Sequence, residues 1–172
     1  LYYYDALNRL IFIEKEGKKT TLLYDAFDRC IQINDDSGQK QHLYQGDKEI
    51  GSIQNGQIKE LRLAHPQPYN EQIFAIEIDQ QTFFPVQDHR YNISALYRHD
   101  GSLAQWYRYT SFGLKSIHGI ETQNPWRFAN RREIAGLSLF KHRLYHPQIC
   151  RWLTTDPIGF EDGLNLYAYA HN

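Results

Sequence analysis

The stretch Tyr4-Asp5-Ala6-Leu7-Asn8-Arg9-Leu10 returns 20 residues later as Tyr24-Asp25-Ala26-Phe27-Asp28-Arg29-Cys30. A third copy, at 44–50, keeps Tyr44 and loses the aspartate and the arginine. Because Tyr, Asp, Ala and Arg recur at the same offsets, chance placement among the chain's 13 tyrosines is a poor explanation. A fixed period of this size is typical of architectures in which each unit buries one face against its neighbours.

Within each unit, apolar and polar side chains alternate after the arginine. Leu10 and Phe12 occupy alternate positions in the first unit, as do Ile31 and Ile33 in the second, with polar Gln32 between them. Alternation of this kind is typical of a β-strand with one buried face. Residues that favour tight reversals separate such stretches, at Asn8, Gly17, Asp28, Gly38, Asn55-Gly56 and Asp100-Gly101. The sequence therefore predicts an all-β fold of antiparallel hairpins, without an amphipathic helix of useful length.

Further strands are expected beyond the first two units, over residues 48–53, 57–63, 73–78, 82–87, 96–99, 103–109 and 139–145. Residues 110–137 have few periodic apolar positions, so we expect a long connection there. From Leu153 onward Pro, Gly and Asn dominate, which predicts a loop-rich plug with one helical turn. We expect repeat hairpins over 1–87 and a core over 88–172 that is continuous with the repeats and does not fold independently.

The repeat resembles the YD repeat of the RHS (rearrangement hotspot) family, whose unit runs Y-D-x-x-G-R-L, at Tyr4, Asp5, Arg9, Tyr24, Asp25, Arg29 and Tyr44. The remainder is similar, in the same order, to that family's D-H-L-G-S segment and repeat-associated core. Its motifs are N-P-[YF]-R-F-x-G-R, G-L-Y-Y-x-x-R-Y-Y-D-P, G-R-[FW]-x-x-x-D-P-x-G and G-x-N-x-Y-x-Y. The matching residues are Asp88, His89, Asn124, Pro125, Arg127, Phe128, Arg131, Arg143, Tyr145, Arg151, Asp156, Pro157, Gly159, Gly163, Asn165, Tyr167 and Tyr169. Asn130, His146 and Cys150 depart from the family's Gly, Asp and Gly.

The resemblance implies a fold and a role. RHS hairpins wind into a closed, hollow shell that encloses a toxic polypeptide, so we expect antiparallel hairpins forming part of a spiralling, shell-like sheet. The implied partners are the remainder of the shell, a C-terminal polymorphic toxin as cargo and a component of a secretion apparatus. The resemblance also implies synthesis in the bacterial cytoplasm and delivery by a dedicated secretion system, and no signal peptide opens the sequence.

Asp156 is the candidate catalytic residue, because the RHS core is a self-cleaving aspartyl-type protease whose first D-P-x-G matches this position. In the family the second aspartate and the leucine after which cleavage occurs lie further on, beyond Asn172. Two carboxylates that share a proton form an acid–base pair, and a single carboxylate does not. We therefore expect this chain alone to be inert as a protease, with Asp156 either half of an aspartyl site or only a turn former.

Three functions stay open at this stage. The chain is the structural C-terminal segment of an RHS shell, a YD-repeat module that binds carbohydrate or protein, or the half-site of an autoprotease. A sugar-binding surface of aromatic side chains favours the second, and a cross-strand aromatic ladder favours the first. The aromatic residues concerned are Trp106, Tyr107, Tyr109, Tyr167 and Tyr169.

Metal and hydrolase patterns are weak. His142 and His146 stand four apart in an expected strand, where that spacing separates them by about 13 Å, and no third ligand is evident. Asp88-His89 with Ser94 or Ser102 lacks the Gly-x-Ser-x-Gly elbow of a hydrolase. We expect no cofactor and no metal.

Bulk composition narrows the partners further. The chain has 172 residues and a net charge of −1, so nothing favours nucleic acid or an anionic membrane surface, and no apolar run is long enough to span a bilayer. Cys30 and Cys150 are expected as free thiols. The chain lacks Met and begins three residues before a repeat tyrosine, so we expect an excerpt of a longer protein. Its open sheet edges are expected to self-associate, over residues 1–15 and 73–88.

Overall fold

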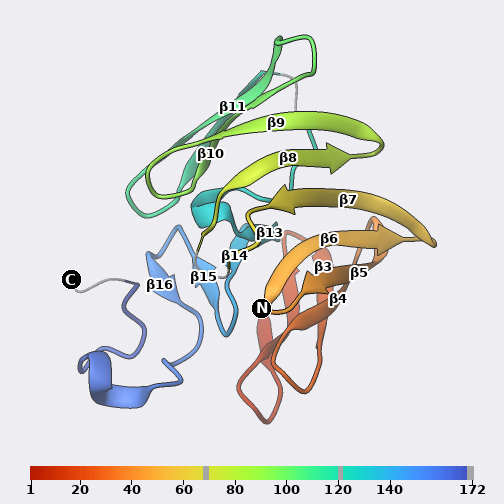
Figure 1. Ribbon diagram of the computed structural model, residues 1–172. Helices are drawn as coiled ribbons and strands as arrows, with labels where there is room; N and C mark the ends of the chain where they lie inside the picture. The colour runs from red at the N-terminus through yellow and green to blue at the C-terminus, as the bar shows by residue number, and fades with distance from the viewer. Residues whose placement is uncertain (68–69, 120–121, 170–172) are drawn as a thin grey trace.

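The computed structural model describes residues 1–67, 70–119 and 122–169, and it is almost entirely β (Figure 1). Its first 12 strands form one open antiparallel sheet, the repeat sheet, in which every strand pairs with the next along the chain. They are β1 (Tyr2–Tyr4), β2 (Leu10–Lys15), β3 (Lys18–Tyr24), β4 (Cys30–Asp35), β5 (Gly38–Gln45), β6 (Lys48–Gln54), β7 (Gln57–Ala64), β8 (Ile73–Ile78), β9 (Gln81–Gln87), β10 (Ile93–Tyr97), β11 (Leu103–Tyr109) and β12 (Lys115–Gly119). The all-β, antiparallel prediction is therefore confirmed.

Residues 122–169 form a C-terminal lobe that lies against the first strands of the repeat sheet (Figure 1). It contains a 4-stranded antiparallel sheet and two short 3-10 helices: η1 (Phe128–Asn130), β13 (Arg132–Ile134), β14 (Leu137–Leu139), β15 (Leu144–His146), β16 (Arg151–Trp152) and η2 (Gly159–Asp162). Leu137 and Leu144 of the lobe share one hydrophobic cluster with Leu10, Ile13 and Leu22 of the repeat sheet. The two sheets are therefore layers around a common core.

The YD pair builds a clamped turn of five residues. Oδ1 of Asp5 accepts the backbone N–H groups of the second and fourth residues after it, each at 2.9 Å, and Oδ2 accepts Nε of Arg9 at 2.7 Å. Asp25 makes the same three bonds one unit later, at 2.9, 3.0 and 2.7 Å. Asn8 and Asp28 take the left-handed backbone expected at this turn, with φ of 60° and 61°. The repeat therefore encodes a turn whose polar groups are satisfied internally.

The repeat tyrosine joins consecutive units. The hydroxyl of Tyr24 donates to the carbonyl of Leu10, one residue past the preceding clamp, at 2.9 Å. The guanidinium of Arg9 lies 5.2 Å from the centre of the Tyr24 ring. Tyr44 repeats both contacts with the second unit, at 2.9 Å and 5.1 Å. Each Tyr thus ties its unit to the one before it, which explains why Tyr44 is kept where the clamp itself is lost.

The same backbone turn recurs where the sequence period does not show it. In each case the first residue donates to the carbonyl of the fifth, and the fourth donates to the carbonyl of the first, at 88–92, 98–102, 110–114 and 127–131. Asp88 caps its turn as Asp5 does, with Asn92 in place of the arginine. Tyr109 donates to the carbonyl of Ile93 at 2.9 Å, so Tyr109-Thr110 is a further unit with Thr in place of Asp.

The prediction of which side chains of the repeat strands are buried is wrong, because an extra residue shifts the alternation by one position. Phe12 does not share the buried face with Leu10, because Tyr3 pairs with Phe12 while Tyr4 pairs with Leu10, which leaves Ile11 as an extra, bulged residue. The second unit has the same shift at Ile31. The buried side chains of the two strands are Leu10, Ile13, Cys30 and Ile33.

Four other expectations need correction. Residues 110–137 are not a plain connection, because they contain β12, η1 and β13. The strand expected over 139–145 is two strands, β14 and β15, since Phe140 N–H turns back to the carbonyl of Arg143 at 3.0 Å. Residues 73–88 are not an edge, because β10 to β12 extend the sheet past them and leave β1 and β12 as its outer strands. The strands expected over 48–53, 57–63, 73–78, 82–87 and 103–109 fall on β6 to β9 and β11, and η2 matches the expected helical turn. The strand expected over 96–99 begins three residues too late, because β10 spans Ile93–Tyr97.

The clamp predicts a specific stability loss. Asp25→Ala removes two backbone caps and the anchor of Arg29, and should lower the free energy of unfolding by about 2 kcal/mol in urea denaturation. Asp36→Ala, in an exposed turn, is the matched control and should change it by less than about 0.5 kcal/mol. Equal losses in the two variants would show that the clamp contributes nothing specific.

Candidate functional site

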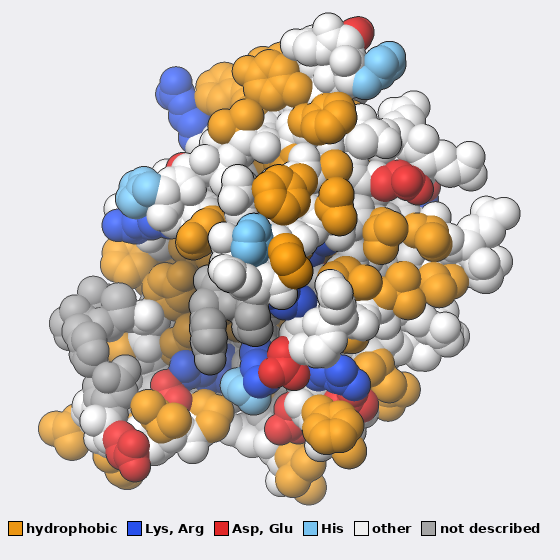
Figure 2. Space-filling model, viewed as in Figure 1, with side chains coloured by type: hydrophobic (Ala, Val, Ile, Leu, Met, Phe, Trp, Pro, Cys, Tyr) orange, Lys and Arg blue, Asp and Glu red, His pale blue; other side chains and the backbone are white. Residues whose placement is uncertain are grey.

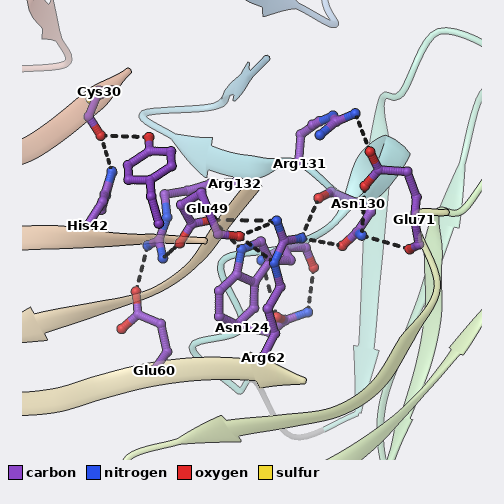
Figure 3. A network of polar contacts seen from close by, with 12 residues as sticks. Cys30, His42, Glu49, Glu60, Arg62, Glu71, Asn124, Asn130, Arg131 and Arg132 are labelled. Carbon is purple, nitrogen blue, oxygen red and sulfur yellow. Dashed lines mark hydrogen bonds and ion pairs between the residues drawn. The ribbon is translucent and has the colours of Figure 1, made fainter. Parts of the chain in front are cut away.

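A buried group of charged side chains joins the C-terminal lobe to the repeat sheet (Figure 3). Arg132, the first residue of β13, donates from Nη2 to Oε1 of Glu49 on β6 at 2.8 Å and from Nη1 to Oε1 of Glu60 on β7 at 2.6 Å. The three side chains are 4%, 10% and 6% exposed. Arg132 therefore bridges two neighbouring strands, although it lies more than 70 positions from both glutamates in the sequence.

Two further groups complete this ionic junction. Trp126 donates from Nε1 to Oε2 of Glu49 at 2.6 Å, and the guanidinium groups of Arg62 and Arg132 lie 5.2 and 5.3 Å from its ring. Arg62, on β7, donates from Nη1 to the backbone and side-chain oxygens of Asn130, at 3.0 and 2.8 Å. Two carboxylates thus face two guanidinium groups, and the junction carries no net charge.

Charge pairing favours the ionised forms of Glu49 and Arg132 in spite of their burial. Burial opposes the charge of Glu49, but the neighbouring Arg132 and Arg62 outweigh burial and lower the pKa of that carboxyl. Burial likewise opposes the charge of Arg132, but Glu49 and Glu60 outweigh it and raise the pKa of Arg132. A buried carboxylate in this environment acts as a fixed anion and not as a proton donor near neutral pH.

His42 lies on the same face of the sheet as this junction. It pairs across the strands with Ser52, which pairs with Glu60. Its Nδ1 lies 2.7 Å from the carbonyl of Cys30, so this nitrogen carries the proton of the neutral ring, while Nε2 is buried without a partner among the described residues. Burial, followed by the nearby Arg132, lowers the pKa of His42 to about 4. His42 is therefore neutral at pH 7.

The candidate catalytic carboxylate, Asp156, is engaged in local structure. Its Oδ2 lies 2.6 Å from Nη1 of Arg143, and its Oδ1 accepts the backbone N–H of Ile158 at 3.1 Å. The guanidinium of Arg143 lies 4.2 Å from the centre of the Trp152 ring. No second carboxylate is paired with Asp156 in the part of the chain that the structure describes. Both roles considered for Asp156 remain predictions.

The other core-motif residues hold the lobe together. The side chain of Asn124 bonds to the backbone N–H and carbonyl of Trp126, and the carbonyl of Pro125 accepts the N–H of Glu133. Arg127 pairs with Glu133, and Arg131 pairs with Glu71. Phe128, Tyr145 and Tyr169 belong to one aromatic cluster. The remaining matching positions lie in β16 and in the segment that follows it. Gly159 and Gly163 have positive φ, Asn165 accepts the N–H of Tyr167, and Arg151 is an exposed residue of β16. Pro157 and Tyr167 are also exposed.

The weaker patterns do not assemble into sites. His89 is exposed, Asp88 is used in its turn, and Ser94 donates to the carbonyl of Val86, so no hydrolase triad forms among them. Over the described residues no group of three or more potential metal ligands gathers, around His142 and His146 or elsewhere.

The aromatic residues do not form one surface either. Tyr107 is 3% exposed, and the ring of Trp106 is stacked on His118 at 4.0 Å with the guanidinium of Arg108 5.0 Å from it. Tyr169 lies in the aromatic cluster of the lobe, and Tyr167 is 41% exposed. This arrangement matches the ladder expectation for residues 106–109 and leaves no open aromatic platform there.

Cys30 and Cys150 are free, Cys30 in the buried face of β4 and Cys150 at a turn. Within the described ranges, no helix has the length and apolar character needed to cross a bilayer.

The whole fold has known counterparts. The crystal structure of TcdB2-TccC3 superimposes with a TM-score of 0.72, at 17% identity, over 97% of this chain and 10% of that one. The same complex without its hypervariable C-terminal region gives a TM-score of 0.72 at 16% identity, over 97% and 9%. A structure of the Photorhabdus luminescens Tc holotoxin pore matches equally well. At this level of identity the likeness establishes the fold.

Sequence relatives cover less of the chain. The toxin subunit YenC2 of Yersinia entomophaga is 34% identical over 74 residues, which is 41% of this chain and 8% of the relative. Double-stranded DNA deaminase toxin A of Burkholderia cenocepacia is 32% identical over 74 residues, 42% of this chain and 5% of the relative. No family model matches. The chain thus has the fold of a toxin-complex chain and partial sequence similarity to toxin proteins, and it spans a tenth or less of their length.

Sequence reasoning missed the ionic junction. Glu49, Glu60, Arg62 and Arg132 looked like ordinary surface charges of mixed sign. One signal was present: on β7 the charged Glu60 and Arg62 alternate with Leu61 and Leu63, and an alternating strand must bury one of the two sets.

Removing one member of the ionic junction should lower the stability of the fold. Arg132→Met leaves Glu49 and Glu60 buried without a partner and should lower the free energy of unfolding by about 3–5 kcal/mol. Adding Glu49→Gln and Glu60→Gln to that variant removes the orphaned charges and should recover part of the loss. Arg151→Met, an exposed control, should stay within about 0.5 kcal/mol of the wild type in urea denaturation. If the triple variant is no more stable than Arg132→Met, the charge-pairing explanation is contradicted.

The lowered pKa of His42 predicts weaker stability in mild acid. The unfolded chain takes up this proton near pH 6.5 and the folded chain near pH 4, so stability is complete above pH 6.5 and falls between those values. The loss from this group should be about 2 kcal/mol by pH 5. His42→Asn should remove that component of the pH dependence, whereas His89→Asn should leave it intact, as measured by denaturation from pH 7.5 to 5. Identical pH profiles of the two variants would refute the assignment.

Proposed function

We propose that this chain is a structural segment of a toxin-associated β-shell of the RHS type, in which repeat hairpins form the wall and the C-terminal lobe packs on its inner side. The observation that carries the proposal is the superposition of nearly the whole chain, 97%, on a segment of TcdB2-TccC3. The clamped YD turns and the tyrosine contacts between units support it independently, because they provide a rule for extending one sheet unit by unit.

The sheet is suited to be part of a larger wall. Its strands follow sequence order without a crossover, so strands can add at either edge without rearranging those already present. Hydrophobic side chains remain exposed on the upper part of the face in Figure 2, where Figure 1 places β8 to β11. Phe74, Phe84 and Leu103 are 46%, 46% and 47% exposed. Exposed apolar area of this kind marks surfaces that other protein covers.

The proposed partners are the remainder of the shell at the edges of the repeat sheet and a toxin polypeptide inside it. Delivery through a secretion system is proposed from the family resemblance alone. We also propose that the core region over 88–172 depends on residues 1–87 for folding, since Glu49 and Glu60 match the buried charge of Arg132.

For Asp156 we propose a structural role in this chain. Its ion pair with Arg143 and its cap on Ile158 engage both carboxylate oxygens. The chain should therefore show no self-cleavage, and Asp156→Asn and Arg143→Gln should destabilise the lobe by similar amounts, about 1 kcal/mol each, with less than additive loss in the double variant. Self-cleavage that is abolished by Asp156→Asn would overturn this role and restore the catalytic one.

Open edges predict self-association. The outer strands β1 and β12 each have one unpaired side in the described sheet, and such strands are templates for pairing. Sedimentation velocity should show concentration-dependent association, and Tyr3→Lys with Ser116→Lys should weaken it by placing charges on both edges. A monomer at high concentration, with fast amide exchange along β1 and β12, would argue against edge pairing.

The shell function is tested by replacement. This chain is substituted for the segment of the TcdB2-TccC3 chain on which it superimposes, and assembly and protease protection of the enclosed region are measured. A functional wall segment should give a closed particle with a protected interior, and the same graft carrying Arg132→Met is the control for a lobe that cannot dock. Particles that fail to close around a folded graft would refute the proposal.

A further inference from the structure

A charged cleft lies between the repeat sheet and the C-terminal lobe. Its volume is about 700 Å³, within the range of about 300–1,000 Å³ typical of ligand sites. It is lined by residues of β3, β4, β5, β7, β8 and β12, and by residues 123–125, 127 and 132–135 of the lobe. The walls therefore come from both ends of the repeat sheet and from the lobe, and the cleft exists only when all three are in place.

The lining carries six basic and three acidic side chains. Glu60 is paired with Arg132, and Glu133 with Lys115 and Arg127, whereas Asp35 accepts from Ser37 and keeps its charge. The side chains of Lys18 and Lys40, from β3 and β5, form no ion pair or hydrogen bond among the described residues. Basic side chains thus outnumber acidic ones in the lining by six to three, and a ligand that reaches Lys18 and Lys40 should be anionic.

The rest of the lining mixes polar side chains, Gln123 and Asn124, with apolar ones. Ile33 and Ile78 of the repeat sheet, Ile117 of β12 and Ile134 of the lobe border the cleft. Both arginines of the lining are committed to carboxylates, so the forked guanidinium contacts that favour phosphate are not free. Lysine charges beside isoleucine side chains suit carboxylates interspersed with apolar groups better than a phosphodiester backbone.

The outer edge of β12 borders the same cleft. Lys115 and Ile117, alternate residues of this strand, are part of the lining, and β12 is the last strand of the sheet. An extended segment laid along such an edge gains backbone hydrogen bonds, and its alternate side chains enter the neighbouring pocket. The geometry thus favours an extended polypeptide over a compact small molecule.

We propose that this cleft binds an extended acidic peptide segment, whose carboxylates meet Lys18 and Lys40 and whose apolar side chains pack on the partly exposed Ile117. The proposal rests on the proposed shell function in one respect, because the cargo polypeptide is then the natural source of such a segment. The recognition itself depends only on the charge and shape of the cleft.

The test uses the 172-residue chain and a fluorescein-labelled octapeptide of alternating Glu and Val, followed by fluorescence anisotropy. Lys18→Gln with Lys40→Gln should weaken binding about tenfold, as expected for two charge-assisted contacts of partly exposed lysines. Lys141→Gln with Arg151→Gln removes the same charge elsewhere and should weaken it less than twofold. Binding of the Glu-Val peptide should also fall between low salt and 0.5 M NaCl, since exposed charge pairs are screened.

Several results would overturn the proposal. They are equal losses in the two double variants, equal binding of a Lys-Val octapeptide, or tighter binding of a labelled single-stranded octanucleotide. Association of the chain with itself that blocks peptide binding would assign the cleft to a second copy instead. If the peptide does not bind but the chimeric particle closes, the peptide-binding proposal is rejected and the shell function stands. If the peptide binds but the particle does not close around a folded graft, the shell function is rejected and peptide binding stands.

Discussion

The contact of Arg132 with Glu49 and Glu60 is the constraint on which the relation of the two sheets depends. Both carboxylates lie on neighbouring strands of the repeat sheet, and their charges are buried, so each needs a fixed cation. Arg132 supplies it only if β13 lies at one place and in one orientation. Hydrophobic packing of Leu137 and Leu144 on β2 tolerates small sliding, whereas a bridged pair of charges does not. The junction therefore sets the register of the lobe on the sheet.

The repeat sheet is stabilised differently, by local closure and nearest-neighbour contacts. Each clamp satisfies its own backbone within five residues, and each Tyr reaches one unit back. Such contacts repeat indefinitely and do not by themselves fix where the sheet ends. The lobe is the non-repeating part, and its long-range bonds, from Arg62 to Asn130 and from Arg131 to Glu71, tie it to one region of the sheet. The lobe thus sets where it docks on the sheet, and the repeat sets how the sheet propagates.

Much of the fold was predictable, because the signals that define it are local. The Tyr-Asp period and the turn residues gave the antiparallel hairpins and most strand positions. The bulge at Ile11 was not predictable from alternation, since an extra residue exchanges the two faces and buries Ile13 in place of Phe12. The unit at Tyr109-Thr110 was missed because Thr replaces the Asp that marks the repeat, although its hydroxyl still caps the turn.

The candidate site was predictable only where a motif named its residues. Asp156 and Arg143 are motif positions, but their pairing needs the three-dimensional fold, as does the burial of Glu60 and Arg62. On β7 the leucines face outward, with Leu63 64% exposed, and the charged set faces inward. Alternation shows that two faces differ and does not show which one is buried. The lobe determines which face is buried, because it packs Arg132 against the charged face of β7 and so provides a partner for Glu60.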